Sequence, residues 1–113
     1  MRFAHAHHAF LAQCRYYADI GKSLESAALA VITAETAQWS RYPAVRAEAL
    51  AQCRQARHDL SLTDAALNAA VRAGADLTSR QVSVFHDAEN AARREVASLR
   101  QTLSSIEMSL RTT

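Results

Sequence analysis

Glycine and proline are scarce in this chain, since its 113 residues include only two glycines and one proline. Strands joined by tight turns need many more of these residues, so their scarcity argues against an all-β or α/β fold. Aromatic residues make up only 6% of the chain, and alanine dominates its apolar residues, which is typical of slim, closely approaching helices. The sequence therefore predicts an all-α protein, and its length predicts a single domain over residues 1–113.

A strong net charge and a long apolar run are also lacking. Thirteen basic and eleven acidic residues leave a net charge of +2, far below the basic excess of proteins held mainly by phosphates. No apolar segment approaches the roughly 20 residues of a membrane-spanning helix, and no cleavable signal peptide is recognisable. Without a secretion signal, Cys14 and Cys53 are expected to be reduced core thiols rather than a disulfide. We therefore expect a cytoplasmic protein without a membrane span.

Apolar residues recur at steps of three or four through most of the chain, which predicts long amphipathic helices. The first helix is expected over about residues 4–38. Its predicted core stripe is Phe3, Phe10, Cys14, Tyr17, Leu24, Ala28, Val31 and either Ala34 or Glu35. A second stripe comprises Val45, Ala49, Cys53, Ala56 and Leu60. A third runs from Leu67 to Leu110 and includes Phe85, Val96, Leu103 and Ile106.

The only tryptophan and the only proline lie together in the stretch ETAQWSRYPAV, residues 35–45. Pro43 disfavours the α conformation at Tyr42 and offers no backbone donor, so the first helix should end near Trp39. The fixed φ of Pro43 suits the first turn of the following helix. The stretch therefore predicts a helix corner, with Trp39 at the end of the first helix and Pro43 at the start of the second.

The number of helices between Pro43 and the C-terminus depends on weak breakers. Ser61 and Asp64 could form a capping box, whereas Gly74 could end one helix and Asp76 cap the next. A break near Gly74 is preferred, because three helices of about 35, 30 and 35 residues cover one another along their whole length. An unbroken rod would reach roughly 100 Å, and its distal half would need another chain in a coiled-coil dimer or larger assembly. The expected architecture is an antiparallel helical hairpin or a three-helix bundle with long helices.

The residue constellations that catalysis needs are missing. No Gly-rich phosphate loop, nucleophile elbow or Glu-x-x-His pair occurs. Cys53 and His58 are five residues apart, which places them on different faces of a helix. The sequence therefore predicts a protein that is not an enzyme and carries no cofactor.

The sequence also offers candidate residues for two alternative functions, metal binding and nucleic-acid binding. His5 and His8 share a helical face, and His86 could join them in a metal site, although a polar helix start is the simpler interpretation of these histidines. A small subunit of a nucleoprotein assembly is the other alternative, and its phosphate contacts would be Arg72, Arg80, Arg93 and Arg94. The mixed charge along the helices favours solvated faces over nucleic-acid binding.

A helix, a turn centred on Trp39, and a long helix with Phe85 and Glu89 four positions apart resemble the WXG100 family of small secreted helical-hairpin proteins. This resemblance implies an antiparallel hairpin that is recognised by a type VII secretion system and exported without a cleaved signal peptide. It also implies partner-binding roles for Trp39, which packs the turn, and for Phe85 with Glu89, which face the partner. The chain departs from the family at Arg41, which replaces the glycine of the turn, and at Phe85, which replaces a tyrosine. The prediction is a protein that packs helices against a protein partner or against itself.

Overall fold

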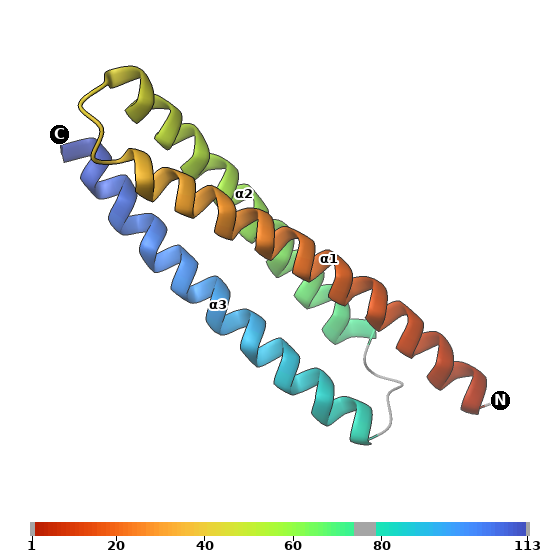
Figure 1. Cartoon of the computed structure of the whole chain (residues 1–113). Helices are drawn as coiled ribbons and strands as arrows, with labels where there is room; N and C mark the ends of the chain where they lie inside the picture. Colours follow the sequence, from red (N-terminus) through yellow and green to blue (C-terminus); the bar gives the residue numbers. More distant parts are fainter. Residues whose placement is uncertain (1, 74–78, 113) are drawn as a thin grey trace.

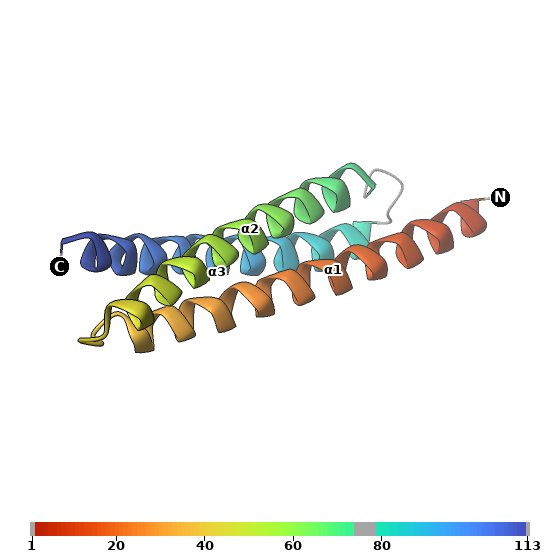
Figure 2. The same ribbon diagram turned by 90° about the horizontal axis from the view of Figure 1, so that it is seen from above.

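The computed structural model describes the backbone of residues 2–73 and 79–112 and the side chains of residues 16–73 and 83–112. Its helices are α1 (Arg2–Ala37), α2 (Pro43–Ala73) and α3 (Ser79–Thr112). They lie along one another in an elongated up-down-up arrangement (Figure 1, Figure 2) that measures 63 × 18 × 16 Å. The predicted all-α class and three-helix arrangement are therefore confirmed.

The corner between α1 and α2 forms where the sequence predicts it. At the end of α1, the Gln38 amide donates to the Ala34 carbonyl at 3.0 Å, and the Ser40 amide donates to the Ala37 carbonyl at 3.0 Å. Pro43 is the first residue of α2, a position at which a missing donor costs nothing. The side chain of Ser40 accepts a hydrogen bond from the Tyr42 amide at 3.1 Å, which fixes the entry into α2.

The predicted separation of residues 44–111 into two helices is also confirmed, because α2 ends at Ala73 and α3 begins at Ser79. The suggested caps, Gly74 and Asp76, lie outside the described residues. None of the described helices is long and apolar enough to cross a membrane.

Alanine forms the seam between α1 and α2, which make the most extensive helix contact of the bundle. The buried alanines of this seam are Ala27, Ala30, Ala34, Ala49 and Ala56. Each is at most 5% exposed. Small side chains let two helix backbones approach closely, so the alanine bias of the sequence becomes a tightly packed antiparallel hairpin.

Larger side chains fill the space between α3 and this hairpin. The core residues that α3 contributes are Phe85, Val96, Leu103, Ile106 and Leu110. Leu60 and Leu67 of α2 face them and are fully buried. The packing thus divides by residue size, with alanine between α1 and α2 and bulky residues beneath α3.

Polar contacts fasten α3 to α2 along its length. Arg57 pairs with Glu107 at 2.6 Å, and Arg100 pairs with Asp64. The guanidinium of Arg46 also donates to the Leu110 carbonyl at 3.0 Å, which gives the last turn of α3 a partner for a carbonyl with none inside the helix.

A larger side chain in the alanine seam is expected to destabilise the protein. Replacing Ala27, which is 0% exposed, by leucine should lower the free energy of unfolding by about 1–3 kcal/mol, because the two backbones have no room for it. Urea denaturation followed by circular dichroism would measure this change. Ala18→Leu, at an exposed position of the same helix, is the control and should leave stability nearly unchanged. Equal effects of the two substitutions would contradict a close-packed seam.

Candidate functional site

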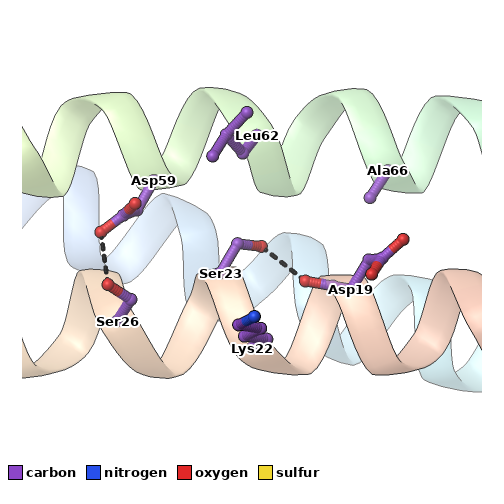
Figure 3. Close-up of a pocket in the computed structure, with 7 residues that line it drawn as sticks. All are labelled: Asp19, Lys22, Ser23, Ser26, Asp59, Leu62 and Ala66. Carbon is purple, nitrogen blue, oxygen red and sulfur yellow. Dashed lines mark hydrogen bonds between the residues drawn. The ribbon is translucent and has the colours of Figure 1, made fainter.

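A polar pocket of about 410 Å³ lies between α1 and α2. Its lining residues are Asp19, Lys22, Ser23, Ser26, Asp59, Leu62 and Ala66. Figure 3 shows these side chains reaching the pocket from both helices, with the ribbon of α3 behind them. The pocket therefore belongs to the α1–α2 hairpin alone.

A buried hydroxyl pair crosses the hairpin beside this pocket. The hydroxyls of Ser23 and Thr63 are 2.6 Å apart, and Thr63 also donates to the Asp59 carbonyl at 2.8 Å. Ser23 has backbone carbonyls of its own helix within reach, at 2.9 Å on Asp19 and 3.2 Å on Ile20. Both hydroxyls are thus hydrogen-bonded, as buried polar groups must be to avoid a desolvation cost.

Asp59 is the one buried carboxylate among the described residues, at 5% exposure. The Ser26 hydroxyl donates to its Oδ2 at 2.7 Å (Figure 3), and the Gln55 amide donates to its Oδ1 at 3.1 Å. Because Ser26 lies on α1 and Asp59 on α2, this bond and the Ser23–Thr63 pair fix how the two helices align. A slip of one helical turn would leave these buried groups without partners.

The pocket offers little chemistry beyond this alignment. Its lining includes no histidine or cysteine, and one of its two carboxylates, Asp59, is buried and already accepts hydrogen bonds from Ser26 and Gln55. The Ser26 hydroxyl already donates to Asp59, and the Ser23 hydroxyl is already hydrogen-bonded to Thr63. The polar residues here are best explained by the register of the hairpin.

The outer face of α1 carries a different feature, an exposed apolar surface that continues into the corner. This outer stripe comprises Leu29, Ile32, Thr33, Thr36, Trp39 and Tyr42. Its large apolar members are each 59–78% exposed. Leu29, Ile32 and Thr36 share one side of α1 by their spacing, the exposed Glu35 lies beside them, and Trp39 follows in the turn after the helix ends at Ala37.

The threonines add to the apolar character of the outer stripe. The Thr33 hydroxyl donates to the Leu29 carbonyl at 2.9 Å, and the Thr36 hydroxyl donates to the Ile32 carbonyl at 2.9 Å. These bonds turn the polar group of each threonine toward its own backbone. A partner that covers the stripe would therefore leave neither hydroxyl without a hydrogen bond.

The predicted partner-binding residues are arranged differently from the expectation. Trp39 is 78% exposed, so the prediction that it packs the turn is wrong, although its surface is available to a partner. Phe85 is only 3% exposed and belongs to the core, so its side chain does not face a partner. The carboxylate of Glu89 pairs within α3 with Arg93 at 2.9 Å and approaches His86 at 3.5 Å. The structure brings Phe85 and Glu89 close together on α3, but Trp39 lies in the α1–α2 corner near the opposite end of the bundle (Figure 1).

Of the four arginines named for nucleic acid, the structure describes the side chains of Arg72, Arg93 and Arg94. Arg93 is held by Glu89 and also donates to Asn68 at 3.3 Å. Arg72 and Arg94 are exposed. The side chain of Arg80 lies outside the described residues.

The residues that the structure describes contain no cluster of side chains that could bind a metal ion. The side chains of His5 and His8 lie outside these residues. Cys53 is a free, buried thiol, as its place in the predicted core stripe suggests. Burial raises the pKa of Cys53, the negative charge of Glu107 raises it further, and Arg57 and Arg54 oppose the shift.

The outer stripe and the polar register contacts are the features that sequence reasoning missed. Leu29 and Ile32 are large apolar residues outside the predicted core stripe, and this mismatch was the available sign of an exposed surface. Thr63 falls between Leu60 and Leu67 at the spacing of the apolar stripe, which was a sign that a polar residue enters the core. Comparisons with protein-family models, curated proteins and solved structures find no match to the chain.

Proposed function

We propose that this chain is a non-enzymatic helical protein that acts by packing the outer stripe of α1 against a helix of a protein partner. The observation that carries the proposal is the exposure of four large apolar side chains within residues 29–42. Leu29, Ile32, Trp39 and Tyr42 are 59%, 59%, 78% and 65% exposed. Contiguous apolar surface on a small protein commonly marks an interaction site. In the polar pocket, in contrast, Ser26 bonds to Asp59 and Ser23 bonds to Thr63, and these contacts hold the hairpin.

The energetics of the outer stripe suit helix packing. Full burial of a leucine or isoleucine side chain contributes about 1.5–3 kcal/mol relative to leaving it exposed. Tryptophan and tyrosine are enriched among the residues that dominate binding energy at protein interfaces. Leu29 and Ile32 lie three positions apart and Thr36 follows one turn later, which is the spacing that one helix presents to another.

Site-specific photo-crosslinking in cells that make the protein would test this proposal. A photoreactive amino acid at position 32 is expected to give a discrete crosslinked product, because Ile32 lies within the proposed contact. The matched control is position 84 on α3, since Val84 is 63% exposed and Ile32 is 59% exposed. A Trp39→Lys change should weaken the product from position 32. Equal products from positions 32 and 84 would contradict the assignment of this surface.

A more specific version of this proposal is that the protein is recognised by a secretion system. Its support is the antiparallel α1–α2 hairpin with Trp39 at the turn, which agrees with the resemblance to secreted helical hairpins. Trp39 is the residue of that resemblance whose side chain is exposed for recognition. Phe85 contributes to the fold instead, so recognition would depend on the corner rather than on α3.

A further inference from the structure

The polar pocket between α1 and α2 contains a negative charge that the alignment of the hairpin does not require. Asp59 is 5% exposed, and its oxygens accept hydrogen bonds from two neutral donors, Ser26 and Gln55. None of the ion pairs in the described part of the chain includes Asp59. A neutral asparagine would also hydrogen-bond to Ser26 across the hairpin. Because a buried charge without a counter-charge is costly, the charge of Asp59 needs a separate explanation.

Lys22 is the basic residue of the pocket lining, but it does not neutralise Asp59. Lys22 is exposed, and Figure 3 shows no hydrogen bond between it and either carboxylate of the lining, Asp19 or Asp59. Two carboxylates and one ammonium group leave the lining with an excess of negative charge. The pocket therefore favours a cationic ligand.

The two carboxylates lie at opposite ends of the pocket (Figure 3). Asp59 is bound by Ser26, and Asp19 precedes Ser26 by seven residues on α1, which is about 10 Å along the helix axis. Leu62 lies between these ends and is 48% exposed. The pocket thus has an apolar wall in the middle and a carboxylate at each end.

We propose that the polar pocket binds a linear aliphatic diamine that spans it lengthwise. One ammonium group donates to Asp59, the hydrocarbon chain lies along Leu62, and the second ammonium group pairs with Asp19. The pocket volume of about 410 Å³ falls within the roughly 300–1,000 Å³ of small-molecule sites. This ligand site is separate from the outer stripe and does not depend on the proposed protein partner.

The remaining acceptor capacity of Asp59 suits an ammonium group. A carboxylate has about four acceptor positions, and Ser26 and Gln55 use two of them. A metal ion matches the pocket less well, because metal ligands must converge on one point, whereas Asp19 and Asp59 are about two helical turns apart. A monoamine would pair with one carboxylate and leave the other without a cation. The length of the diamine is therefore the basis of selectivity.

Isothermal titration calorimetry with the purified full chain at low ionic strength tests this site. The probes are putrescine, octamethylenediamine and hexylamine. Octamethylenediamine should bind at least about tenfold more tightly than the other two, because it alone is long enough to reach both carboxylates. A hydrogen bond to a charged group is worth enough free energy for such a factor. It should also raise the midpoint of thermal unfolding, since it bridges α1 and α2 in the folded state.

Substitutions of single carboxylates identify the two ends of the site. Asp59→Asn should raise the dissociation constant of octamethylenediamine about tenfold. Asp19→Asn, at an exposed position, should abolish the preference for octamethylenediamine over hexylamine. The matched control is Asp87→Asn, which removes the same charge from an exposed position of α3 and should leave both affinities unchanged. If circular dichroism shows that Asp59→Asn does not fold, Asp19→Asn decides the question.

Three results would overturn the proposal. The first is the absence of binding by any of the three amines. The second is an affinity that does not depend on chain length. The third is an equal loss of affinity in Asp19→Asn and Asp87→Asn, which would indicate general attraction of cations to the surface.

Discussion

Replacing Phe85 by alanine is expected to lower the free energy of unfolding by about 3–5 kcal/mol, the usual cost of removing a buried aromatic side chain. Phe85 is 3% exposed and packs with Ile20, Leu67 and Ala70 in the second core cluster. Its ring lies 6.0 Å from the ring of Tyr17, at an interplanar angle of 45°. The substitution therefore removes contacts with both α1 and α2. Urea denaturation at constant pH would measure the change.

The neighbouring Val84 provides the control for this substitution. Val84 is 63% exposed, so Val84→Ala should change stability by less than about 0.5 kcal/mol. Glu89→Ala removes ion pairs with partly exposed residues, and such pairs contribute about 0–1 kcal/mol. A Phe85→Ala protein as stable as Val84→Ala would show that the ring faces a partner rather than the core. If the large loss is found, any loss of export or binding in Phe85→Ala must first be attributed to unfolding.

The helix boundaries could be predicted because local chemistry determines them. Pro43 restricts the residue before it and suits the start of a helix whatever surrounds it, so the corner follows from sequence alone. Most of the stripe of α2 was also predictable, since Ala49, Cys53 and Ala56 repeat at helical spacing and are all buried, but Val45, expected at its start, is 39% exposed. In both cases the sequence signal, a proline or a periodic spacing, lies within one segment of the chain.

Which face of α1 is buried was less predictable, because this helix carries apolar residues on several of its faces. Leu24 and Ala28 were expected in its core stripe but are only partly buried, whereas Ser23 and Ala27 are buried. A helix with leucine, isoleucine and alanine on several faces has no single apolar side. Its buried face is decided by α2, where Thr63 and Asp59 offer partners to Ser23 and Ser26. That choice depends on contacts between residues 33 and 40 positions apart, and the periodicity of the sequence carries no information about such contacts.

The pair Leu60 and Leu62 offers the sharpest test of which side of α2 forms the core. Leu60 is 0% exposed and lies in the main core cluster, whereas Leu62 is 48% exposed at the pocket. Leu60→Ala is expected to lower the free energy of unfolding by about 2–5 kcal/mol, through lost transfer energy and the cavity left behind. Thermal and urea denaturation would both measure this loss.

Leu62→Ala removes the same atoms from the same helix, so helix propensity affects both variants equally. It should cost well under half as much as Leu60→Ala, because the Leu62 side chain is already half in water. A rotation of α2 about its axis would make the two losses similar or reverse their order, and would also separate Thr63 from Ser23. A large loss for Leu60→Ala with a small one for Leu62→Ala requires the rotation of α2 about its axis in which Asp59 and Thr63 face α1. The two leucines thus test the hairpin alignment that positions the outer stripe.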